Sequence, residues 1–112
     1  MRKLFTCLFA LVSLGAMPAW AGTLDDDEAA GIRFMAEEEK LAHDVYLVFQ
    51  RKYSERVFPN IRRSEQNHMA AMDGLLERYA LQDPKLPGVG RFTDASLQAL
   101  YDRLIVAIAS FA

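Results

Sequence analysis

The stretch RRSEQNHMAAMDGLLERY, Arg62 to Tyr79, places polar side chains inside the apolar stripe of a predicted helix. The stripe advances by four and three residues in turn, so its members share one helical face. Its positions are Ile61, Glu65, His68, Met72, Leu75 and Tyr79. A carboxylate and an imidazole are therefore expected to point toward the interface between this helix and a neighbour.

An upstream helix, expected from about Ala29 to Tyr53, has a stripe of the same kind. Its members are Met35, Glu39, Ala42, Tyr46, Phe49 and Tyr53, again at steps of four and three residues. Glu39 is thus a second acid in an otherwise apolar seam. We expect the two helices to pack antiparallel and to bury between them Met35, Tyr46, Phe49, Met72, Leu75 and Tyr79.

The connector between these helices determines whether their polar residues lie at the same height along the helix pair. Pro59 restricts Phe58 to extended geometry, and Asn60 is suited to cap the second helix, which is expected from Ile61 to about Leu81. Glu65 would then lie one turn into its helix, whereas Glu39 lies roughly 21 Å from the end of the first helix at about 1.5 Å per residue. The prediction therefore requires an extended connector.

A third helix is expected after a loop. The prolines and glycines of residues 83–90 predict this loop, and GVG within it is interpreted as a turn because no strand precedes it. Thr93 or Asp94 then caps a helix with an apolar repeat at Leu97, Leu100, Leu104, Ile108 and Phe111. No alternating strand pattern occurs, so the predicted fold class is all-α.

The three polar stripe residues, Glu39, Glu65 and His68, predict a metal site. A buried carboxylate costs several kcal/mol unless it is neutralised, paired or bound to a cation. Glu and His three residues apart project side by side, as they do in the carboxylate sites of four-helix proteins. This mixture of oxygen and nitrogen ligands suits iron, manganese or zinc.

Two other interpretations stay open. Glu65 can pair with Arg62 or Arg78 while His68 donates to a carbonyl, which would make the chain a metal-free helical interaction module. Alternatively, thioether and imidazole groups suit soft copper. A periplasmic copper-binding protein would then use His68, Met69 and Met72.

Three segments resemble a known family: FMAEEEKLAHDVYLVF, VFPNIRRSEQNHMAAMDGLLERYALQDP and FTDASLQALYDRL. They are similar to the bacterial ferritin-like family catalogued as domain of unknown function 2202, in the rubrerythrin-like superfamily. The resemblance covers most of the span from Ile32 to Leu104. It implies a four-helix carboxylate-bridged fold in which Glu39, Glu65 and His68 form half of a two-metal site for iron or manganese, with no established substrate.

The sequence departs from that family after Leu104. The family continues into two further helices with more acidic ligands, whereas this sequence reads IVAIASFA. We therefore expect a C-terminally truncated, incomplete four-helix bundle, in which a ferritin-like antiparallel hairpin is followed by a third helix. Any non-haem di-metal oxidoreductase-like activity is expected to be lost. We expect this truncated chain to self-associate, since its exposed apolar faces need a partner. A homodimer that pools two hairpins is the alternative, because a two-fold axis duplicates every ligand.

The first 21 residues have the pattern of a secretory signal peptide. A basic start, Met1 to Lys3, precedes an apolar run, Leu4 to Ala16, and the cleavage signature AWA at residues 19–21. The run is shorter than the ~20 residues that span a bilayer. We expect a signal peptide at 1–21, a helical domain at 22–112, and an exported protein, periplasmic or extracellular, without membrane association after cleavage.

Charge and cysteine content exclude further function classes. The chain has 13 basic and 15 acidic residues, and two of the basic ones, Arg2 and Lys3, lie in the signal. The residues after the signal carry a net negative charge and contain no basic stripe, which argues against nucleic acid as a partner. The single cysteine, Cys7, also lies in the signal, so no disulfide is expected after cleavage.

Cleavage after Ala21 should leave an exported protein that begins at Gly22, because Ala19 and Ala21 supply the small residues that determine the cleavage site. N-terminal sequencing of secreted material measures this directly. Recovery of an intact Met1 from the cytosol would contradict the export assignment.

Overall fold

The computed structural model describes residues 22–54 and 57–111, and it forms three α-helices. These are α1 (Asp26–Tyr53), α2 (Val57–Arg78) and α3 (Ala95–Ser110). The described residues contain no strand, so the all-α prediction is confirmed. In this part of the chain, no helix is long and apolar enough to span a membrane. The expected signal peptide, residues 1–21, lies outside the described residues.

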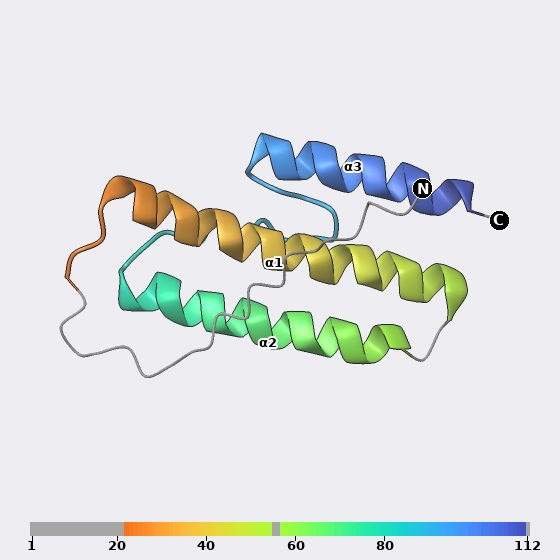
Figure 1. Cartoon of the computed structure of the whole chain (residues 1–112), viewed down its shortest axis with the longest axis horizontal. Coiled ribbons are helices and arrows are strands. Elements are labelled where there is room, and N and C mark those ends of the chain that lie inside the picture. Colours follow the sequence, from red (N-terminus) through yellow and green to blue (C-terminus); the bar gives the residue numbers. More distant parts are fainter. Residues whose placement is uncertain (1–21, 55–56, 112) are drawn as a thin grey trace, which may run out of the picture.

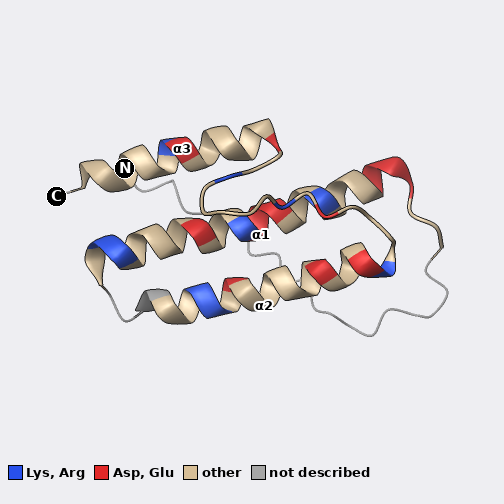
Figure 2. Cartoon of the chain, turned by 180° about the vertical axis from the view of Figure 1, so that it is seen from behind, with Lys and Arg blue, Asp and Glu red and all other residues tan. Residues whose placement is uncertain are grey.

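Helix α1 is the centre of the arrangement (Figure 1). Helix α2 packs antiparallel along one side of it and α3 packs along another, while α2 and α3 do not contact each other. Figure 2 shows the segment between α2 and α3 crossing one face of α1. Every packed element of the described chain therefore depends on α1.

Helix α1 begins earlier than predicted because Asp25 caps it. The Asp25 side chain accepts a hydrogen bond from the Glu28 backbone at 2.7 Å, and the Glu28 side chain accepts one from the Asp25 backbone at 2.9 Å. This reciprocal capping box satisfies two backbone donors at the helix start. The helix ends at Tyr53, as predicted, where Ser54 adopts a left-handed conformation with φ 51°.

Helix α2 also begins earlier than predicted, at Val57 instead of Ile61. The predictions of extended geometry at Phe58 and of a cap at Asn60 are wrong, because both residues lie inside the helix. Pro59 falls in the first turn, where backbone N–H groups have no partner within the helix, so its missing N–H breaks no hydrogen bond.

The end of α2 is tighter than expected. The helix stops at Arg78, short of the predicted Leu81. Ala80 adopts φ 51°, its N–H donates to the Glu77 carbonyl at 3.1 Å, and the Leu81 N–H donates to the Leu76 carbonyl at 2.8 Å. This pair of hydrogen bonds is a Schellman motif, which reverses the chain into the following segment.

Two apolar clusters hold the helices together. The cluster between α1 and α3 contains Leu41, Val45, Phe92, Leu97, Tyr101 and Ile108, with Phe49 and Tyr53 packed against it. The cluster between α1 and α2 contains Ala36, Met72 and Leu76, with Ile32 and Leu75 packed against it. The predicted apolar repeat of α3 is thus mostly confirmed.

Two predicted core residues are exposed. Met35 is 36% exposed, because Ile32 and Ala36 occupy the side of α1 that faces α2. Phe111 is 65% exposed, because it follows the end of α3 and no longer belongs to the helical repeat. Tyr46 and Tyr79 are half-buried. The prediction that Phe49 lies between α1 and α2 is wrong, because Phe49 packs against the cluster between α1 and α3.

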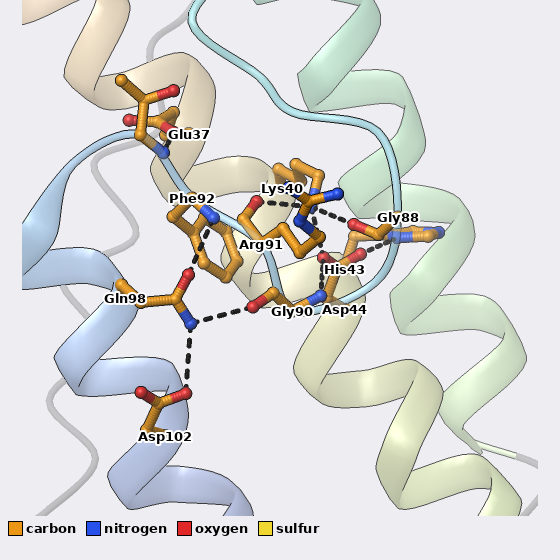
Figure 3. Close-up of polar contacts among 11 residues, drawn as sticks. Glu37, Lys40, His43, Asp44, Gly88, Gly90, Arg91, Phe92, Gln98 and Asp102 are labelled. Carbon is orange, nitrogen blue, oxygen red and sulfur yellow. Dashed lines mark hydrogen bonds and ion pairs between the residues drawn. The ribbon is translucent and has the colours of Figure 1, made fainter.

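A buried ion pair on α1 anchors the segment before α3 (Figure 3). Lys40 Nζ donates to Asp44 Oδ2 at 2.6 Å and to the carbonyl oxygens of Gly88 at 2.8 Å and Arg91 at 3.1 Å. The Gly90 N–H donates to the same Asp44 oxygen at 2.9 Å. Donors and acceptors of the loop backbone are thus satisfied by one turn of α1.

Both ends of α3 are also held from α1. The Glu37 carboxylate accepts hydrogen bonds from the backbone N–H groups of Thr93 at 2.5 Å and Asp94 at 2.9 Å. At the other end, Lys52 Nζ donates to the carbonyls of Ile108 at 2.5 Å and Phe111 at 2.6 Å. Helix α3 therefore runs in the same direction as α1.

Gly90→Ala should destabilise the protein by at least about 2 kcal/mol. Gly90 has φ +78°, and a Cβ there would overlap the ring of Tyr101. Gly74→Ala in α2 is the matched control, because a Cβ meets nothing within 4 Å, and it should be neutral or stabilising. Urea unfolding measures both. Equal effects of the two substitutions would contradict the close approach of Gly90 to Tyr101.

Candidate metal centre

The structure brings together the three predicted site residues. Glu39 comes from α1, and Glu65 and His68 come from α2. One ligand atom from each side chain lies within 4.8 Å of the other two. Within residues 22–54 and 57–111, it is the one group of three or more histidine, cysteine and acidic side chains that lie close enough together to hold a metal ion.

The cluster is closed on one side and open on the other. His68 Nδ1 lies 3.2 Å from Glu39 Oε2 and 3.5 Å from Glu65 Oε2. The Glu65 side chain is 1% exposed, whereas those of Glu39 and His68 are 27% and 43% exposed. A ligand would therefore reach Glu65 from the side of Glu39 and His68.

The early start of α2 makes this convergence possible. His68 lies about 16 Å along the helix from Val57, and Glu39 lies about 21 Å from the end of α1 at Tyr53. The remaining difference of about one helical turn is within the reach of the two side chains. The expected extended connector through Asn60 is wrong, because residues 57–60 are helical and add about 6 Å to the rise.

Glu65 is the residue that the surrounding protein satisfies least. Its Oε2 is buried and accepts no hydrogen bond among the described residues. Burial, followed by the nearby Glu39 carboxylate, raises the pKa of Glu65 from 4.5 to about 8. A positive ion would reverse both effects, because it favours the charged form of each carboxylate. An orphaned carboxylate oxygen beside a second acid and an imidazole therefore fits a cation.

The arginine partners considered for Glu65 are engaged elsewhere. Arg62 Nη1 donates to the Gln50 side-chain oxygen at 2.6 Å, and Arg78 lies over the ring of Tyr79, 5.7 Å from its centroid. In the part of the chain that the structure describes, neither one forms an ion pair with Glu65. The internal partners left for Glu65 in the metal-free interpretation are therefore His68 and, when Glu65 is protonated, Glu39.

The three candidate copper ligands do not share one site. Met72 is buried against Ala36 and Leu76, and His68 contacts Glu39. Met69 lines a cavity that neither of them lines. Consecutive residues of a helix point about 100° apart, which is why His68 and Met69 face different surroundings.

Sequence interpretation missed the buried polar residues Glu37, Lys40 and Asp44. A charge run such as Glu37 to Glu39 usually marks a solvated face, but Glu37 is 2% exposed and binds the start of α3. These residues advance by three and four positions, as an apolar stripe does. That polar stripe is the signal that identifies a buried face once its partners in the loop are known.

Metal-free protein should become less stable as pH rises from 4.5 toward 8. The folded state keeps the proton of Glu65 over this range, while the unfolded chain releases it, so the unfolded state binds fewer protons and the free energy of unfolding falls. Glu65→Gln should remove this contribution, whereas Glu38→Gln, at an exposed neighbour, should retain it. Urea unfolding with chelator at both pH values measures this, and identical pH profiles for all three proteins would contradict it.

Comparison with known proteins places the chain in a family. The family model described as Uncharacterized protein domain (DUF2202) matches residues 28–111. An uncharacterized protein of Methanocaldococcus jannaschii is 42% identical over 83 residues, which make up 73% of this chain and 45% of that protein. The chain thus spans about half the length of this curated relative. No solved structure matches the chain. Since the match extends from α1 to the end of α3, the chain belongs to the DUF2202 family.

Proposed function

We propose that this protein binds iron or manganese through Glu39, Glu65 and His68, as half of a ferritin-like carboxylate site. The observation that supports this most strongly is Oε2 of Glu65, a buried acceptor without a hydrogen bond in the described chain. Such a group costs about 1–3 kcal/mol or more when it stays unsatisfied. A cation at the cluster offsets that cost.

The charges of the cluster also favour a divalent ion. Two ionised carboxylates carry the same charge, of opposite sign, as one divalent cation, and neutral imidazole adds a nitrogen ligand without changing the balance. Oxygen ligands with one nitrogen suit manganese and iron better than they suit soft ions. Iron or manganese held there would supply redox chemistry, and Glu39, Glu65 and His68 would hold it at the open side of the cluster.

The ferritin-like assignment is part of this proposal. It is supported by the antiparallel pairing of α1 and α2, and by the position of Glu65 and His68 opposite Glu39 across that pair. In four-helix carboxylate proteins, one glutamate from a helix and a Glu-x-x-His motif from its neighbour form such a half-site. The proposal extends to metal binding and to no catalysed reaction.

Protein purified without chelator should contain iron or manganese at no more than about one ion per chain, because three ligands make at most half of a two-metal site. Glu65→Ala and His68→Ala should each lower the metal content, since each removes a ligand. Met72→Leu, which changes a buried neighbour of similar size, should leave it unchanged. Elemental analysis of the four proteins measures this.

A wild-type protein without metal would contradict the proposed metal site. If the wild-type protein holds no metal and Glu65→Leu increases its stability, then Glu65 is an imperfectly paired core group. The metal-free helical interaction module would then be the better description of this chain.

A further inference from the structure

An open cavity lies beside the α1–α2 pair, next to the loop that precedes α3. Its volume is about 540 Å³. We call it the loop-side cavity, and it is lined by Lys40, His43 and Asp44 of α1, Met69 of α2, and loop residues 83 and 85–89. None of the three residues of the candidate metal centre lines it.

Asp44 determines which nitrogen of His43 carries the proton. Asp44 Oδ2 accepts hydrogen bonds from the Lys40 ammonium and from the Gly90 N–H, so the carboxylate is an ionised acceptor (Figure 3). Its other oxygen, Oδ1, lies 3.2 Å from His43 Nδ1. Because an ionised carboxylate only accepts, Nδ1 is the protonated nitrogen, and Nε2 of the neutral ring keeps its lone pair.

This lone pair is available for a ligand. No hydrogen bond reaches His43 Nε2 from any residue in the ranges 22–54 and 57–111, and His43 lines the loop-side cavity. A histidine whose other nitrogen donates to a carboxylate is the usual form of a histidine metal ligand in proteins. Asp44, whose side chain is 4% exposed, is fixed by three contacts and holds the ring in place.

The second ligand group in the cavity is the thioether of Met69. Met69 comes from α2, whereas His43 comes from α1, and Met69 is half-buried. Side chains of a helix lean toward its N-terminus, so in this antiparallel pair the side chains of His43 and Met69 lean in opposite directions along the helix axes. An imidazole and a thioether from two different helices thus line the same cavity.

The nearby acids do not favour a hard divalent ion here. Asp44 is occupied by Lys40, Gly90 and His43, and Asp83 pairs with Lys85 Nζ at 3.1 Å. Leu86, Pro87 and Val89 contribute apolar walls. Two neutral, polarisable ligands beside apolar walls suit a soft monovalent cation, since thioether and imidazole groups select Cu(I).

We propose that the loop-side cavity binds Cu(I) through Nε2 of His43 and the sulfur of Met69, with Asp44 as the positioning residue. The site is separate from Glu39, Glu65 and His68 and does not depend on metal binding there. It also differs from the copper ligands suggested by the sequence, because it keeps Met69 and replaces His68 and Met72 with His43.

Anaerobic titration of the purified chain with Cu(I), in competition with a chromophoric chelator, tests the site. We expect about one ion per chain, and a loss of affinity of more than about tenfold for Met69→Leu and for His43→Gln, since even a second-shell partner is worth that much. Met35→Leu is the matched control, because Met35 is an exposed methionine outside the cavity. Circular dichroism checks that each variant is folded.

The result that overturns the proposal is an affinity that Met69→Leu and Met35→Leu leave equal, or that falls with His68→Ala and not with His43→Gln. NMR of the wild-type chain gives an independent test that needs no variant. Addition of Ag(I), a redox-inert substitute for Cu(I), should shift the His43 Nε2 and Met69 methyl signals, and Nδ1 should be the protonated nitrogen beforehand. Unshifted signals, or a proton on Nε2, would also refute it.

Discussion

The buried ion pair between Lys40 and Asp44 is the interaction on which the arrangement of the chain beyond α2 depends. It satisfies two carbonyl groups and one N–H group of the loop, so the loop can lie against α1 without buried polar groups left unpaired. Removal of one member of such a pair leaves an uncompensated buried charge and commonly costs about 3–5 kcal/mol. The loop in turn leads into α3 and forms a wall of the loop-side cavity. Fold and cavity therefore share one electrostatic anchor.

The chain buries acids in two different ways. Glu37 and Asp44 each accept at least two hydrogen bonds from loop backbone or from Lys40, and their role is to hold the loop and α3 in place. Glu65 is equally buried, but its Oε2 accepts no hydrogen bond among the described residues. Burial alone does not separate a structural acid from a candidate ligand. The hydrogen bonds that the carboxylate accepts separate the two cases.

The convergence of Glu39, Glu65 and His68 could be predicted from sequence because it depends only on helical period and on two helices that face each other. The start of α2 could not, because the preference of Phe58 before a proline was overridden by the tolerance of a first helical turn for Pro59. The exposure of Met35 was missed for a related reason. Adjacent stripe positions differ little in their apolar character, and only packing decides which of them, Met35 or Ala36, faces α2.

The burial of Glu37, Lys40 and Asp44 could not be predicted from the local sequence of α1. Lys40 and Asp44 have the spacing of an ordinary exposed ion pair on a helix surface. Their partners lie 46 to 51 residues further along the chain, in a loop whose backbone conformation depends on positive φ angles at Gly88 and Gly90. Nothing in the local pattern of α1 indicates that this loop returns to it.

Because α1 binds both ends of α3, the distance between the two contacts must be the same along both helices. Glu37 and Lys52 are about 22 Å apart along α1, and the groups that they bind, at Asp94 and Ile108, are about 21 Å apart along α3. One residue inserted between either pair would move one contact by about 1.5 Å and rotate it by about 100°. Insertions or deletions within these spans are tolerated only when both helices change together. Variation in chain length is therefore confined to the connecting segments, where it leaves the register of α1 and α3 intact.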